Sequence, residues 1–205
     1  MTLGYTRNHV LGVRQPRERR DAAQHRQQVL EAAARLFGER GVESVTMDEI
    51  AHAAGVGKGT LYRRYGDKSQ LVLALMDEPV AELQESLAHL PTYPHVLDAL
   101  KAVLSLMAAW VDQHSAELGV VAEQRALQCS SLYAWMHGLV VDLLTDALTE
   151  GETDLVDPVY SADALLAALD VDLYRFQRDR RGYSVEQIEA GLHGLVDRLG
   201  AHALV

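Results

Sequence analysis

The chain has 205 residues, of which 48% are hydrophobic and 23% charged, as is ordinary for a globular protein. One cysteine, Cys129, excludes an intramolecular disulfide, and no run approaches the ~18 apolar residues that a membrane span requires. The formal net charge of −10 taken alone argues against nucleic acid as a partner, because phosphates repel acidic surfaces. The N-terminus is polar and basic and lacks the apolar segment of a signal peptide, so a cytoplasmic protein is expected.

Residues 1–20 form a basic arm without periodicity, which carries Arg14, Arg17, Arg19 and Arg20. We expect this arm to be disordered in the free protein. It is either a solvated tail or an arm that enters a minor groove beside a DNA site. A helix is expected over residues 21–40, which ends at Gly41 and has apolar residues at helical spacing: Val29, Ala33, Leu36 and Phe37.

A short helix is predicted to begin after Thr46. Thr46 and Glu49 have the spacing of a capping box, in which each side chain satisfies a backbone N–H group of the other. Gly55 can adopt the left-handed conformation that ends a helix. Between them, apolar residues recur at helical spacing: Met47, Ile50, Ala51 and Ala54.

A second short helix is predicted from about Gly57–Thr60 to Tyr65, with Leu61 and Tyr65 one turn apart and facing inward. The remaining surface then carries cations, hydroxyls and a bare backbone position: Lys58, Gly59, Thr60, Tyr62, Arg63 and Arg64. This mixture suits contacts to phosphates and base edges. The two helices together are typical of a DNA-reading helix-turn-helix, although any one of these side chains could equally belong to a solvated face.

Another helix is predicted to open at Asp67, which forms a second possible capping box with Gln70. Lys68 lies in its first turn. Because a helix N-terminus carries free N–H groups and partial positive charge, Lys68 is expected to hold a phosphate there, as Thr46 is at the earlier helix.

The segment from about Asp21 to Leu75 resembles the N-terminal domain of the tetracycline-repressor (TetR) family of bacterial transcriptional regulators. The residues that carry the resemblance are Val29–Phe37, Gly41, Val45–Thr46, Ile50–Ala51, Ala54–Val56, Gly59–Tyr62, Tyr65 and Lys68. One departure is Tyr65, where the family often has Phe. Its hydroxyl needs a partner, either solvent or a phosphate.

The charge divides unevenly along the chain. Residues 1–68 hold 12 Lys or Arg and 8 Asp or Glu, hence +4, whereas residues 69–205 hold 7 and 21, hence −14. This asymmetry indicates that only the N-terminal part meets DNA. We therefore expect an all-α protein with a helix-turn-helix domain of three helices over residues 21–66 and a helical domain for ligand binding and dimerisation over residues 67–205.

Residues 67–88 are expected to form one helix with a kink or break near Asp77 and Glu78, because Pro79 removes a backbone hydrogen bond. The resemblance implies that this helix links the two domains, so the kink is either a hinge or a harmless bend. Further helices are expected over residues 95–113, 115–121 and 123–149. Apolar residues with a few polar anchors suggest either plain core or a small-molecule pocket between these helices: Met107, Trp110, His114, Gln124, Tyr133, Trp135, Met136 and His137.

Two more helices are expected after an acidic loop, from about Ser161 to Arg181 and from Ser184 onward, where Gln187 completes a capping box. Their apolar faces need a partner. The resemblance implies that they meet a second copy in a four-helix bundle, through Leu165, Leu169, Leu173, Ile188, Leu192, Leu195 and Leu199. A dimer would present two recognition helices to half-sites ~34–36 Å apart, which predicts a palindromic operator.

Catalysis finds little support, because the chain has no phosphate-binding loop, nucleophile elbow or Cys-x-x-Cys motif. The histidines lack the spacing of a metal site, so neither metal nor cofactor is expected. The resulting hypothesis is a dimeric repressor that binds operator DNA and is released by a small, largely apolar molecule. Two alternatives stay open: an activator or constitutive regulator of the same fold, and a helical ligand-binding protein or enzyme that merely contains a helix-turn-helix-like segment.

Overall fold

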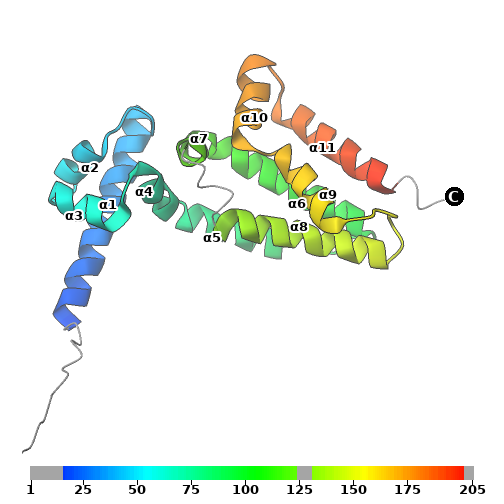
Figure 1. Cartoon of the computed structure of the whole chain (residues 1–205), viewed down its shortest axis with the longest axis horizontal. Helices are drawn as coiled ribbons and strands as arrows, with labels where there is room; N and C mark the ends of the chain where they lie inside the picture. Colours follow the sequence, from blue (N-terminus) through cyan, green and yellow to red (C-terminus); the bar gives the residue numbers. More distant parts are fainter. Residues whose placement is uncertain (1–15, 124–130, 201–205) are drawn as a thin grey trace, which may run out of the picture.

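The computed structural model describes residues 16–123 and 131–200, and every regular element within these ranges is helical. The all-α prediction is confirmed. Helices α1 to α3 form a head at one end of the molecule, and α4 and α5 lead from it to the bundle formed by the remaining helices (Figure 1).

The head consists of α1 (Pro16–Arg40), α2 (Met47–Ala53) and α3 (Lys58–Tyr65). Their apolar faces share one core, which includes Phe37, Val45, Ile50 and Leu61. Helix α1 begins earlier than expected, at Pro16, a residue type that is favoured in the first turn because it has no N–H to leave unpaired. Residues 16–20 therefore belong to a helix and not to the predicted arm. Residues 1–15, with Arg14, lie outside the described residues.

The expected helix 67–88 is broken into α4 (Lys68–Leu75) and α5 (Asp77–Ala88) at Met76. The predicted break is thus present, just before Asp77. Pro79 lies in the first turn of α5, where its missing N–H group costs no hydrogen bond within that helix. Helix α4 packs against both α1 and α7, so it contacts the head and the bundle.

The bundle contains α6 (Val96–Gln113), α7 (Ser115–Glu123), α8 (Ser131–Thr149) and α11 (Val185–Gly200). Helix α6 is its centre, because α5, α8 and α11 all pack on it. This explains why α6 is apolar around much of its circumference, with Leu100, Leu104 and Met107 fully buried. The predicted capping box at the start of α11 is confirmed, since Ser184 and Gln187 exchange both backbone-to-side-chain hydrogen bonds.

The expected single helix from Ser161 to Arg181 is wrong. It is divided into α9 (Pro158–Ala167), α10 (Val171–Arg175) and a turn of wider helix, η1 (Phe176–Arg180). The division follows from two aspartates that act as N-caps: Asp157 opens α9, and Asp170 accepts hydrogen bonds from the backbone N–H groups of Asp172 and Leu173. Within the described ranges, no helix is long and apolar enough to cross a membrane.

Candidate DNA-binding surface and ligand cavity

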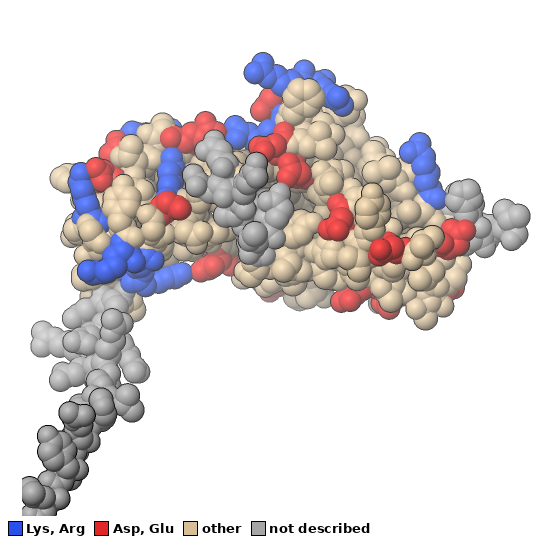
Figure 2. Space-filling model, in the orientation of Figure 1, with Lys and Arg blue, Asp and Glu red and all other residues tan. Residues whose placement is uncertain are grey.

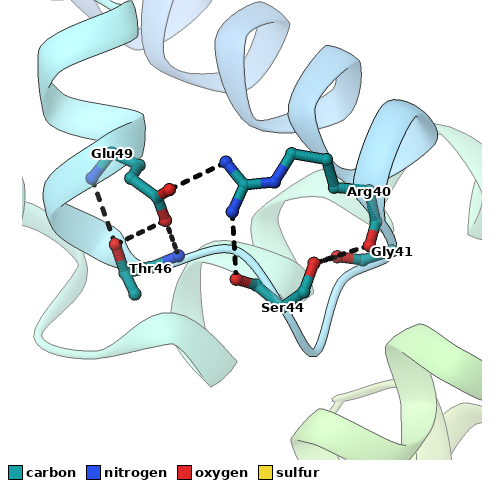
Figure 3. A network of polar contacts seen from close by, with 5 residues as sticks. All are labelled: Arg40, Gly41, Ser44, Thr46 and Glu49. Carbon is teal, nitrogen blue, oxygen red and sulfur yellow. Dashed lines mark hydrogen bonds and ion pairs between the residues drawn. The ribbon is translucent and has the colours of Figure 1, made fainter.

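Helix α2 is fixed at its N-terminus by the predicted capping box. The Thr46 hydroxyl accepts from the Glu49 N–H group (3.3 Å), and a Glu49 carboxylate oxygen accepts from the Thr46 N–H group (2.8 Å). Arg40, at the end of α1, donates to the same carboxylate (2.7 Å) and to the Ser44 carbonyl (Figure 3). These hydrogen bonds lower the pKa of Glu49 to about 2, and those from Thr46 have the largest effect. The network ties the start of α2 to the end of α1.

The C-terminus of α2 is closed by a pair of backbone hydrogen bonds. Gly55 has φ +65°. Its N–H group donates to the His52 carbonyl (3.1 Å), and the Val56 N–H group donates to the Ala51 carbonyl (3.0 Å). This pairing is a Schellman motif, which satisfies carbonyls that the helix end would otherwise leave open. The turn between α2 and α3 is therefore set by local hydrogen bonds.

Helix α3 presents the predicted polar face to solvent. Leu61 and Tyr65 are buried, while all six residues expected at the DNA surface are exposed: Lys58, Gly59, Thr60, Tyr62, Arg63 and Arg64. Lys58 forms an ion pair with Asp48 of α2. Arg63 has no ion pair within the part of the chain that the structure describes, so its guanidinium is available to an external anion.

The other two residues expected on phosphates are already engaged. The Thr46 hydroxyl donates to Glu49 (2.7 Å) besides capping α2. The Lys68 ammonium, half-buried, donates to the Glu43 carbonyl (3.1 Å). Asp67 caps α4 by accepting from the Gln70 N–H group, but the second half of the predicted capping box is replaced, since the Asp67 N–H group donates to the Tyr65 carbonyl.

The hydroxyl of Tyr65 is buried and has no hydrogen-bond partner among the described residues. Its predicted partner is either solvent or a phosphate, and neither fits a buried atom. The aromatic ring fills the core of the head, and the guanidinium carbon of Arg64 lies 5.8 Å from the ring centre.

Charge is distributed over the surface as the division of the sequence predicts. Figure 2 shows Lys and Arg side chains gathered at the end that carries the head, and Asp and Glu side chains spread along the bundle. A further basic group lies near the outer end of α10, where η1 contributes Arg178 and Arg180. DNA would therefore be attracted to the head and repelled by most of the bundle.

The bundle contains a cavity of about 390 Å³ between α6, α8, α9 and α10. Its walls are mainly apolar and include Trp110, Val111, Leu132, Met136, Leu166 and Val171. Its polar groups are Tyr133, Asp163 and Asp170. A hollow with mainly apolar walls and a few polar groups is the usual form of a small-molecule site.

Tyr133, Asp163 and His137 form the polar corner of this cavity. The Tyr133 hydroxyl donates to Asp163 Oδ1 (3.1 Å), and His137 Nε2 lies 3.2 Å from the same oxygen. The geometry of the second contact is too poor for a hydrogen bond, which leaves that nitrogen without a good partner. Burial is the main cause that raises the pKa of the Tyr133 hydroxyl, and the neighbouring Asp163 raises it further.

The predicted pocket residues are only partly brought together. Trp110, Tyr133 and Met136 line the cavity, and His137 stands behind Tyr133, with ring centres 5.9 Å apart. Met107 is fully buried core. The His114 ring lies tilted against the Trp110 ring, with ring centres 4.9 Å apart, and burial lowers the pKa of His114. Trp135 borders two other hollows, and Gln124 lies outside the described residues. The α9–α10 wall was missed, because nothing in its sequence distinguishes cavity lining from core.

Two contacts connect the cavity walls with the rest of the molecule. The Trp110 indole N–H group donates to the Pro79 carbonyl in the first turn of α5 (3.1 Å). Arg175 of α10 forms an ion pair with Glu43 of the head (3.1 Å). Its guanidinium passes close over Gly119 of α7, where a Cβ atom would lie 2.5 Å from Nη1. A larger residue at Gly119 would displace this end of the Arg175 side chain.

The residues predicted at a dimer interface lie on two different faces. Leu165, Leu169, Ile188 and Leu192 are buried within the single chain, Leu199 is half-buried, and Leu173 and Leu195 are exposed. Two further apolar side chains in this part of the chain are exposed to a similar degree, Phe176 of η1 and Tyr183 of the loop before α11, so that the four have exposures of 39–46%. The helical spacing of these residues does not distinguish the inner face from the outer one.

A capped helix-turn-helix with a basic outer face, joined to a helical bundle with an apolar cavity, defines a DNA-binding transcriptional regulator. Residues 29–75 match the family model of bacterial regulatory proteins, tetR family. The N-terminal domain of the chain is therefore a tetR-family domain.

Known proteins resemble the chain over most of its length. An HTH-type transcriptional regulator of Staphylococcus aureus strain MRSA252 is 29% identical over 175 residues, which cover 82% of this chain and 90% of the relative. A TetR-family regulator from Pectobacterium atrosepticum has a TM-score of 0.68 at 21% identity, over 92% of this chain and 98% of that one. AibR in complex with isovaleryl coenzyme A and operator DNA has a TM-score of 0.55 at 24% identity, over 83% and 97%.

Proposed function

We propose that the protein is a ligand-responsive repressor, which binds a palindromic operator as a homodimer and leaves it when a small molecule occupies the cavity. The observation that carries this proposal is the exposed face of α3, with Tyr62 and Arg63 at the surface and Leu61 in the core. A recognition helix in this position can enter a major groove while α1 and α2 hold its orientation. Arg63 supplies a cation that no other described residue neutralises.

The proposed dimer forms through the exposed apolar side chains of α10, η1 and α11. Leu173, Phe176, Tyr183 and Leu195 are each exposed at 39–46%, and exposed apolar side chains that together form a patch mark an interaction surface. A second copy would bury it across a two-fold axis, and the buried leucines of α9 and α11 would support the interface from behind. Of the leucines predicted from the sequence, this proposal keeps the two that are exposed, Leu173 and Leu195.

Release requires that the ligand bind one state more tightly than the state that fits DNA. The cavity offers two routes to such a difference. Trp110 lies in its wall and holds the Pro79 carbonyl of α5, next to the break at Met76. Helix α10 lines it through Val171 and reaches the head through Arg175. Either route would change the position of the head when the wall moves.

AibR, which was solved with isovaleryl coenzyme A and operator DNA, supports the pairing of these two kinds of ligand in one such fold. Its likeness to this chain favours a DNA-binding regulator over a helical enzyme that merely contains a helix-turn-helix-like segment. A constitutive regulator or an activator of the same fold would show no release by any small molecule.

The test is gel retardation of DNA from the promoter region of the protein's own gene, followed by footprinting. Wild type should protect a palindrome, and Tyr62→Ala and Lys68→Ala should both weaken binding by at least about thirtyfold, the loss of one contact of about 1 kcal/mol in each half-site. Tyr160→Ala is the matched control, since Tyr160 is 73% exposed on α9, away from the head. Equal affinity of Tyr62→Ala and wild type would refute the assigned DNA surface.

A further inference from the structure

The cavity in the bundle combines apolar walls with a negatively charged rim. Asp163 of α9 and Asp170 at the start of α10 both line it, beside the rings of Trp110 and Tyr133. In residues 16–123 and 131–200, no Lys or Arg side chain lines it. A ligand must therefore match an apolar interior and two carboxylates at its polar end.

Among the described residues, neither carboxylate is paired with a Lys or Arg side chain. Asp163 accepts from the neutral hydroxyl of Tyr133 and has only a poorly oriented contact with His137, and its side chain is 55% exposed. Asp170 accepts from the N–H groups of Asp172 and Leu173 through Oδ1 alone, so Oδ2 remains available. Both groups can thus accept a hydrogen bond or a positive charge from a ligand.

We propose that the effector is an amphiphilic cation, in which an amine or quaternary ammonium group is attached to an apolar body. This inference rests on the proposed function, since it specifies the ligand of the same cavity. The apolar body contacts Met136, Leu166 and the other walls. The cationic group lies at the rim between Asp163 and Asp170, where the π-faces of Trp110 and Tyr133 add further attraction.

An anionic effector would meet the opposite electrostatics. A coenzyme A thioester, the ligand bound by AibR, would have to place its phosphates at or outside this rim. There the carboxylates of Asp163 and Asp170 repel them. Similarity of fold therefore does not carry over to the charge of the ligand.

The test is isothermal titration calorimetry on the full chain with three probes that share a chain of ten carbons: decyltrimethylammonium, 1-decanol and decanoate, the two ionic probes below their micelle concentrations and decanol below its solubility limit. We expect the ammonium to bind at least about tenfold more tightly than decanoate, a modest ratio because the rim is partly screened by solvent. Decanoate that binds as tightly as the ammonium would overturn the inference.

Two variants locate the charge. Asp163→Asn and Asp170→Asn should each weaken ammonium binding by about five- to tenfold and leave decanol binding unchanged, which shows that the cavity remains intact. Asparagine is as good an N-cap as aspartate, so the second variant keeps α10 in place. Asp146→Asn, on the exposed side of α8, is the control and should change nothing. An equal loss for decanol and ammonium would assign the aspartates a structural role and refute the proposal.

Gel retardation in parallel separates this inference from the proposed function. Ammonium that binds as predicted but leaves the DNA complex intact would support the ligand class and refute release. Decanol or decanoate that releases DNA while the ammonium is inert would support release and refute the ligand class.

Discussion

Arg63 provides the sharpest test of the DNA-binding surface, because it is the exposed cation of α3 that lacks an ion pair within the described residues. In a dimer, Arg63→Gln removes one positive charge from each half-site. Each phosphate contact contributes about 0.9 to the slope of log affinity against log salt, so the slope should become shallower by about 1.8. Between 50 and 200 mM salt the variant should then lose about tenfold less affinity than wild type.

The assay is fluorescence anisotropy with a labelled operator at four or more salt concentrations. Arg198→Gln is the matched control, because Arg198 lies in the last turn of α11 and is exposed. It changes the net charge by the same amount without touching the head. An Arg63→Gln slope equal to that of wild type, or an equal change in Arg198→Gln, would refute the placement of α3 on the phosphates.

Two further predictions concern the stability of the head. Tyr65→Phe should raise the free energy of unfolding by about 1 kcal/mol, because it removes a buried hydroxyl without a partner and keeps the ring; a lower urea midpoint would show that the hydroxyl has a partner after all. The pKa of Glu49 in the folded protein is lowered to about 2 from an ordinary 4.5. Its ionised carboxylate therefore stabilises the fold fully above pH 4.5, and this stabilisation is lost as the pH falls towards 2. The difference in unfolding free energy between wild type and Glu49→Gln should shrink over that window in denaturant titrations, and a difference independent of pH would contradict this assignment.

Local signals in the sequence predicted the head accurately because its geometry is local. The Thr46–Glu49 capping box and the left-handed Gly55 each depend on residues within a few positions of one another. Capping and turn chemistry of this kind can be read from spacing alone. The ion pair between Lys58 and Asp48 could not be predicted in this way, because nothing in the spacing of two charged residues on neighbouring helices shows that they meet.

The bundle was harder to predict because its features depend on packing between distant segments. Leu165, Leu169 and Leu173 follow one another at intervals of four residues, yet the first two are buried and Leu173 is 39% exposed. The break between α9 and α10 comes from Asp170, an aspartate whose capping role is hidden inside a stretch of helical periodicity. Nor does any local pattern indicate that Arg175 reaches Glu43, 132 positions earlier in the chain.

The position of Trp110 makes the molecule suitable for label-free spectroscopy. Its ring lines the cavity, and its N–H group is held by the Pro79 carbonyl of α5. The chain has one other tryptophan, Trp135, which borders different hollows. Trp135→Phe therefore leaves a single indole whose emission depends on the polarity of the cavity and on one hydrogen bond at the helix junction. The protein thus contains its own optical reporter, which can follow an occupied cavity and a moving junction in the same sample.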